Sequence, residues 1–242
     1  MISKNQIEKD VLNILIKKGA LRISQNKNEF FVLKSGRKSP TFINTGALTD
    51  GEALRKLKST LGNFIAYLLK EKKIEDFDFI FGPSYKGISL AVLACEGLSE
   101  IHGINKRYLY DRKEEKNYGD KKMDQIIVGA GYFKPGQKIL IIDDVITTGG
   151  TNIETIGKLK VLGNHKIVGM ILLADRQEKM GDAENIEDKG PIEYIEKEFG
   201  LKVFPMLDMK TIFDFVKNDL SEEIRRYWID YYNKYGTVKL SA

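Results

Sequence analysis

Short apolar runs alternate with amphipathic segments between residues 52 and 207, and this pattern constrains the fold of the chain more than any other feature. Short apolar runs bounded by turn residues are typical of buried strands, whereas apolar residues three or four positions apart indicate helices. The expected strands are 77–81, 107–110, 126–133, 138–143, 166–174 and 203–207. Around them, helices are expected over 54–68, 87–101, 151–162 and 191–199. This α/β pattern predicts a central, mainly parallel sheet flanked by helices on both faces.

The first 45 residues do not follow this alternation. Residues 6–18 have helical spacing, and residues 30–46 resemble two short strands around a turn. Thr49 and Glu52 have the spacing of a capping box at the start of a helix. We therefore expect a small N-terminal hood or flap on the main sheet.

Two further caps are expected near the C-terminus. Asp208 can begin a helix that reaches about Lys217, and Ser221 can begin a final helix. The chain has 242 residues, which suits one large domain. The predicted division of a single domain is a hood over 1–46, a core over about 47–220 and a C-terminal helix over 221–242.

Composition excludes several classes of protein. The net charge of +5 is mild for a nucleic-acid binder and suits a small anionic ligand equally well. Two histidines and one cysteine, Cys95, leave no plausible zinc cluster and no internal disulfide. No apolar run approaches the ~18 residues of a membrane span, and the first ten residues lack the apolar core of a signal peptide. We expect a cytoplasmic protein without membrane or nucleic-acid partners.

Residues 139–151 read ILIIDDVITTGGT, so that an apolar strand runs into two adjacent carboxylates, Asp143 and Asp144. In open parallel sheets, ligands bind beyond the carboxyl ends of the strands. The small residues and hydroxyls that follow, with a helix N-terminus behind them, suit a phosphate. Carboxylates suit the hydroxyls of a diol and a developing positive charge, and ribose 5-phosphate combines a diol with a phosphate. The alternative, a simple helix cap or turn, is disfavoured by the flanking sequence, and the patterns GxxxxGK[ST] and GxGxxG are absent from the strand–helix turns.

ILIIDDVITTGGT resembles the phosphoribosyl-pyrophosphate motif of the type I phosphoribosyltransferases. Four other segments resemble, in the same order, the signature segments of the orotate phosphoribosyltransferases. They are FVLKSGRKSPTFINTG (31–46), FGPSYKGISLA (81–91), DRKEEKNYG (111–119) and ADRQE (174–178). This resemblance covers roughly residues 5–220. It implies a type I phosphoribosyltransferase-like fold. It also implies transfer of ribose 5-phosphate from 5-phospho-α-D-ribose 1-diphosphate (PRPP) to orotate, which yields orotidine 5′-monophosphate and pyrophosphate in de novo pyrimidine (UMP) biosynthesis.

The resemblance also implies which residues hold PRPP. Asp143 and Asp144 would bind the ribose hydroxyls, and Asp144 is the predicted catalytic member, facing the oxocarbenium-like ring. Lys34, Tyr85 and Lys86 match positions that contact the donor. The predicted cradle of the 5′-phosphate is Val145, Ile146, Thr147, Thr148, Gly149, Gly150 and Thr151.

Residues 111–125 are highly charged and, taken alone, would be a solvated loop. The family places a mobile catalytic loop here, which closes over pyrophosphate and commonly reaches the neighbouring subunit of a homodimer. Arg112, Lys113 and Lys116 match its cationic positions, with Lys113 and Lys116 the predicted catalytic lysines. Tyr118 is a predicted PRPP contact but stands where the family commonly has histidine. A tyrosine donates a hydrogen bond without positive charge near neutrality.

The implied orotate site contains Lys34, Phe42, Ile43, Thr147 and Arg176. Phe42 and Ile43 match the pair that lines the orotate ring, where the family often has two aromatics. Arg176 matches the arginine that grips the orotate carboxylate, a task that suits a planar guanidinium. Mg²⁺ is the implied cofactor, held mainly by substrate phosphates and ribose hydroxyls, and we therefore predict no metal-binding residues.

Two other functions stay open. A regulator of the same fold could sense PRPP while binding nucleic acid, but it would need an added DNA-binding domain or a marked basic surface. No helix-turn-helix is evident before residue 30. A purine or xanthine phosphoribosyltransferase would share the donor motif, but Arg176 and the LKSGRKSP segment favour orotate.

Overall fold

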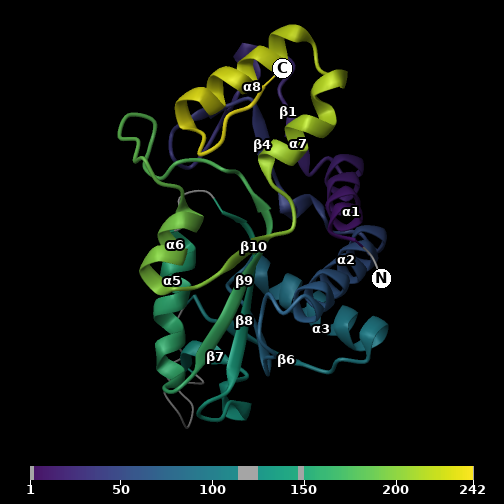
Figure 1. Ribbon diagram of the computed structural model, residues 1–242, viewed down its shortest axis with the longest axis vertical. Coiled ribbons are helices and arrows are strands. Elements are labelled where there is room, and N and C mark those ends of the chain that lie inside the picture. Colours follow the sequence, from purple (N-terminus) through teal and green to yellow (C-terminus); the bar gives the residue numbers. More distant parts are fainter. Residues whose placement is uncertain (1–2, 114–124, 147–149, 242) are drawn as a thin grey trace.

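Six strands form the central sheet, in the order β10-β9-β8-β5-β6-β7. They are seen in a computed structural model that describes residues 3–113, 125–146 and 150–241 (Figure 1). The strands are β5 (Phe79–Gly82), β6 (Arg107–Asp111), β7 (Ile127–Val128), β8 (Lys138–Ile146), β9 (Lys166–Asp175) and β10 (Val203–Pro205). Neighbours from β10 to β6 are parallel, whereas β7 is antiparallel to β6. The predicted α/β class with a mainly parallel sheet is confirmed.

Helices cover both faces of this sheet (Figure 1). They are α2 (Gly51–Lys70) and α3 (Lys86–His102) on one face, and α5 (Gly150–Leu159) and α6 (Pro191–Phe199) on the other. Successive residues of a strand point to opposite faces. Leu140 and Ile142 of β8 therefore join the core beneath α2 and α3, while Ile139 and Ile141 join the core beneath α5 and α6.

The hood consists of two small antiparallel sheets. β1 (Leu21–Ile23) pairs with β4 (Thr41–Ile43), and β2 (Phe31–Val32) pairs with β3 (Lys38–Ser39). The helix α1 (Lys4–Lys17) precedes the hood and contributes to the core that α2 and α3 share.

The C-terminal helices lie at the same end of the molecule as the hood (Figure 1). They are α7 (Met209–Val216) and α8 (Glu222–Tyr235). Phe30 packs edge-on against Tyr227 of α8 at 5.4 Å between ring centroids, and the guanidinium of Arg37 lies 4.8 Å from the ring of Tyr235. Segments from the two ends of the chain thus form one packed layer. The division at residues 46 and 220 stays a prediction.

Several helix ends follow from their capping residues. The side chain of Asp208 accepts a hydrogen bond from the Thr211 amide, and that of Ser221 accepts one from the Ile224 amide, so both predicted caps are confirmed. Pro191 occupies the first turn of α6, where its missing N–H costs nothing. Short 3₁₀ turns occur at Lys27–Glu29, Thr45–Ala47, Ala130–Tyr132, Lys160–Leu162 and Lys217–Asp219.

The predicted capping box at Thr49 is wrong. The N-cap of α2 is Asp50, whose carboxylate accepts from the Ala53 amide at 2.9 Å. Glu52 instead forms ion pairs with Lys17 and Lys18 at the end of α1. A carboxylate close to lysines of another helix has a stronger partner than a backbone amide of its own first turn.

Two strand boundaries also differ from expectation. The strand expected over 126–133 is only Ile127–Val128, because Gly129 adopts φ +89° and turns the chain into a 3₁₀ turn. The strand expected over 138–143 extends to Ile146, which still pairs with Asp175 of β9. Asp143 and Asp144 therefore lie inside β8 and not beyond its end. The short strand β1 was not expected. Within the described ranges, no helix is long and apolar enough to cross a membrane.

Candidate active site

The two adjacent aspartates near the carboxyl end of β8 have different surroundings. Asp143 is 7% exposed and accepts hydrogen bonds from its neighbour's amide at 2.8 Å and from Nδ2 of Asn152 on α5 at 3.0 Å. Burial, and secondly the Asp144 carboxylate, raise the pKa of Asp143 to about 7. Asp143 is therefore poised to change its charge near neutral pH.

Asp144 contacts two residues from segments that lie far from it and from each other in the sequence. Its Oδ2 atom accepts a hydrogen bond from Thr45 Oγ1 at 2.7 Å and forms an ion pair with Lys86 Nζ at 2.9 Å. Thr45 follows β4 of the hood, and Lys86 is the first residue of α3. The predicted donor contacts Lys86 and Asp144 thus meet in space, and Thr45 joins them.

The turn GPSYKG brings Lys86 to this position. A Cβ atom on Gly82 would lie 2.0 Å from the Gly87 carbonyl oxygen, so the turn can close only without side chains there. The peptide bond between Ser84 and Tyr85 is cis. Tyr85 is 72% exposed, with the Lys113 ammonium 5.8 Å from the centre of its ring. The structure therefore places Tyr85, Lys86 and Lys113 together.

Part of the predicted phosphate cradle and loop lies outside the described residues. These positions are Lys116, Tyr118, Thr147, Thr148 and Gly149, and of Thr151 only the backbone is described. The Ile146 side chain is buried in the core, so this residue could offer a ligand only its backbone. Val145 is half-buried, and Gly150 is the first residue of α5.

The predicted base-binding residues lie in the hood and after β9. Phe42 stacks on Phe31 at 5.7 Å between ring centroids, while Ile43 is buried in the core. Adjacent strand residues face opposite ways, so the two side chains cannot line one ring together. Phe31 supplies a second aromatic ring beside Phe42. The sequence did not predict this contact, because Phe31 lies one residue before VLKSG and is not adjacent to Phe42 along the chain. Lys34 is exposed at the β2–β3 turn and lines a cavity of about 740 Å³ with Ser35 and residues 180–182 and 184–187.

Arg176 belongs to a buried ionic cluster. Its side chain is 2% exposed, and its Nε and Nη2 atoms donate to Oε1 of Glu178 at 2.8 and 2.5 Å. Nη2 also donates to Ser39 Oγ, whereas Nη1 has only a 3.5 Å contact with the Thr41 carbonyl. Arg37, 1% exposed, shares Glu178 at 3.4 Å. Two guanidiniums thus face one carboxylate, so these three groups carry a net charge of +1, while the buried Asp175 carboxylate also acts on Arg176.

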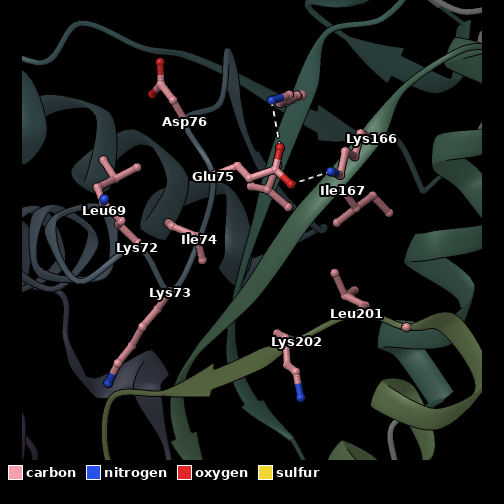
Figure 2. A pocket seen from close by; sticks show the side chains of 13 residues that line it. Leu69, Lys72, Lys73, Ile74, Glu75, Asp76, Lys166, Ile167, Leu201 and Lys202 are labelled. Atoms are coloured by element: carbon pink, nitrogen blue, oxygen red, sulfur yellow. Dashed lines mark hydrogen bonds and ion pairs between the residues drawn. The ribbon is translucent and has the colours of Figure 1, made fainter.

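A second concavity, of about 940 Å³, lies at the amino ends of the strands, where Lys138 begins β8 and Lys166 begins β9 (Figure 2). Five of its lining residues are lysines: Lys72, Lys73, Lys138, Lys166 and Lys202. Glu75 already forms ion pairs with Lys138 and Lys166, and Lys73 donates to the Tyr67 hydroxyl. In Figure 2, Lys73 and Lys202 extend away from Glu75. Two of the five lysines are neutralised by Glu75, and the others do not converge on a common point, so we assign the cluster to the fold.

Comparisons with known proteins agree with this geometry. The phosphoribosyl transferase domain family matches residues 53–203. An orotate phosphoribosyltransferase of Bifidobacterium adolescentis is 40% identical over 76% of this chain and 77% of its own length. The chain belongs to the orotate phosphoribosyltransferase family, of the type I phosphoribosyltransferases.

Two longer matches support the family assignment. The orotate phosphoribosyltransferase of Clostridium beijerinckii is 34% identical over 95% of this chain and 97% of its own length. The crystal structure of the Francisella tularensis orotate phosphoribosyltransferase, 32% identical, covers 93% of this chain and 98% of its own, with a TM-score of 0.73. The predicted family, its fold with an N-terminal hood, and the assignment as an enzyme of this family are confirmed.

Proposed function

We propose that the protein transfers ribose 5-phosphate from PRPP to orotate, forming orotidine 5′-monophosphate and pyrophosphate in pyrimidine biosynthesis. The observation that carries this proposal is the contact of Asp144 with Lys86 and Thr45 beside the N-terminal end of α5. This arrangement offers carboxylates for a diol, a cation for pyrophosphate and a helix N-terminus for a phosphate. The names of the relatives point to the same reaction.

The reaction divides charge between the two halves of the donor. As the C1–O bond breaks, positive charge develops on the ribose ring and negative charge on the leaving pyrophosphate. Asp144 would face the ring, with Asp143 holding ribose hydroxyls, while Lys86, Arg112 and Lys113 would stabilise the pyrophosphate. Fixed charges that lie next to the opposite charge developing in the transition state supply a large part of the rate enhancement in such sites. Lys116, Tyr118 and the cradle residues, with Thr151 among them, are proposed to complete donor binding.

Orotate would enter between the hood and the end of β9. Phe42 and Phe31 offer apolar faces for its ring, and Nη1 of Arg176, whose contact with the Thr41 carbonyl is long at 3.5 Å, would donate to its carboxylate. The excess positive charge of the Arg37–Glu178–Arg176 cluster favours an anionic base. Lys34 and Thr147 remain proposed contacts of the base. Ile43 would contribute packing behind the hood rather than a ring contact.

Mg²⁺ is the proposed cofactor. Asp143 and Asp144 form an acidic pair, but the described residues contain no group of three or more His, Cys, Asp or Glu placed to hold a metal. This donor set fits an ion held mainly by substrate phosphates and ribose hydroxyls. When bound, Mg²⁺ would neutralise charge on the pyrophosphate. We further propose a cytoplasmic homodimer in which the loop after Asp111 serves the neighbouring subunit.

A direct assay tests the reaction. The protein is mixed with orotate, PRPP and Mg²⁺, and the loss of orotate absorbance is followed; steady turnover is expected. Turnover with a purine base but none with orotate would show that the acceptor is a purine and not orotate. Tight PRPP binding without turnover of any base would favour the regulator.

The ionisation of Asp143 predicts a pH dependence. Its pKa is raised to about 7 by burial, so below that pH the free enzyme holds a protonated, uncharged Asp143. We expect kcat/KM for PRPP to fall as pH decreases below about 7, because the neutral acid is a weaker acceptor for the ribose hydroxyls. In the Asp143→Asn variant, the fall in kcat/KM caused by protonation of Asp143 should disappear. Only the pH dependence caused by ionisation of PRPP itself should remain. Identical profiles for both proteins would contradict the assignment.

A further inference from the structure

Three segments of the proposed donor site meet at one buried carboxylate, that of Asp111. Asp111 is the last residue of β6, is 3% exposed, and directly precedes Arg112 and Lys113. Its Oδ1 atom accepts a hydrogen bond from the Ser84 amide at 2.6 Å, and its Oδ2 atom accepts one from Lys158 Nζ at 2.7 Å. The Ser84 hydroxyl also donates to the Asp111 backbone carbonyl.

Each partner of Asp111 belongs to a different segment. Ser84 lies in the GPSYKG turn, immediately before Tyr85 and Lys86. Lys158 lies on α5, the helix that follows the predicted 5′-phosphate cradle, and is itself paired with Glu154 one turn earlier. Because the Asp111 carboxylate is almost inaccessible to water, both of its hydrogen bonds are charge-assisted and little screened.

We propose that Asp111 is a positioning residue for the donor. It fixes the GPSYKG turn and the segment at Arg112, both expected at the pyrophosphate, relative to α5, expected at the 5′-phosphate. PRPP carries these two groups at opposite ends of its ribose, so its binding requires the distance between the two subsites to be set beforehand. The inference rests on the proposed donor site, but Asp111 itself touches no substrate.

Two substitutions at Asp111 test this role. Asp111→Ala removes both acceptors and should lower kcat/KM for PRPP by about a hundredfold, since small displacements of positioning groups cost that much. Asp111→Asn can keep an acceptor for Ser84 but loses the charge that faces Lys158, so it should lower kcat/KM for PRPP by about tenfold. In both variants, KM for orotate at saturating PRPP should stay within about twofold of the wild type, as these contacts lie on the donor side.

The matched control is Asp78→Asn. Asp78 also accepts a hydrogen bond from a backbone amide, that of Lys138 at 2.8 Å, but it is exposed and directly precedes β5, at the amino ends of the strands. Its kinetics should be those of the wild type. Calorimetric titration with PRPP and Mg²⁺, without orotate, gives a reading independent of turnover, in which the Kd should rise in the order wild type, Asp111→Asn, Asp111→Ala.

The possible results distinguish a failure of this proposal from a failure of the proposed function. Unchanged PRPP affinity in folded Asp111 variants, or equal losses for PRPP and orotate, would overturn the proposal. If Asp111→Ala does not fold, the test is made with Asp111→Asn and Lys158→Gln. An unchanged KM for PRPP in both of these variants would contradict the proposal. An inactive wild type would instead mean that the proposed function fails.

Discussion

Replacing Asp144 by asparagine should lower kcat/KM for PRPP by about a thousandfold, at the upper end of what one electrostatic contact in an active site contributes. The substitution keeps the size of the side chain and the acceptor for Thr45, which donates at 2.7 Å. It removes the negative charge, so Lys86 at 2.9 Å loses its partner and the oxocarbenium-like ring loses its counter-charge. Because that charge develops only in the transition state, kcat should fall more than KM for PRPP rises.

Glu75→Gln is a suitable control for this experiment. Glu75 is also a carboxylate that pairs with lysines, Lys138 and Lys166, but at the amino ends of the strands and away from the site. Its ion pairs are exposed, so stability should change little, and turnover should not change. Initial rates at varied PRPP and saturating orotate, with thermal unfolding of each variant, provide the measurements. A loss of less than tenfold in Asp144→Asn would place the catalytic charge elsewhere.

Local pattern was enough to predict the elements of the core. The run ILII in β8 alternates between two cores, and this is the behaviour that a buried central strand requires. Asp208, Ser221 and Pro191 begin helices through bonds within their own first turn or through a fixed φ, so their effect can be read from neighbouring residues. Helix boundaries that depend on such local chemistry could therefore be predicted from the sequence.

The early end of β7 is set locally by Gly129, but the other errors arose where a residue far away in the sequence determines the structure. Glu52 has capping-box spacing but pairs with Lys17 and Lys18 across two helices. β8 continues through two aspartates because β9 offers a paired strand as far as Asp175. The same applies to the site, where Thr45 and Asp144 are 99 residues apart. The family resemblance supplied the expected ligand contacts, but only the folded chain shows that Thr45, Asn152, Glu178 and Asp111 hold them in place.

Arg176→Lys should raise KM for orotate by about a hundredfold and leave KM for PRPP within about threefold. A lysine keeps the positive charge opposite Glu178 but loses the planar guanidinium, whose Nε and Nη2 atoms hold Glu178 and Ser39 while Nη1 is left to reach the orotate carboxylate. One charge-assisted hydrogen bond contributes about 1.5–3 kcal/mol, which corresponds to this loss. Alanine is a poorer choice, because it would remove a partner of the buried Glu178 and could cost about 3–5 kcal/mol of stability.

Arg225→Lys is the matched control for the chemical change. Arg225 is a partly buried arginine on α8 whose Nη2 atom contacts the Leu220 carbonyl, and it has no place in the proposed site. If Arg176 serves only to join the hood to the core through Glu178 and Ser39, Arg176→Lys should lower the unfolding temperature and weaken PRPP and orotate alike. A selective rise in KM for orotate, absent from Arg225→Lys, is the result expected if Nη1 of Arg176, which has only a long contact with the Thr41 carbonyl, binds the base.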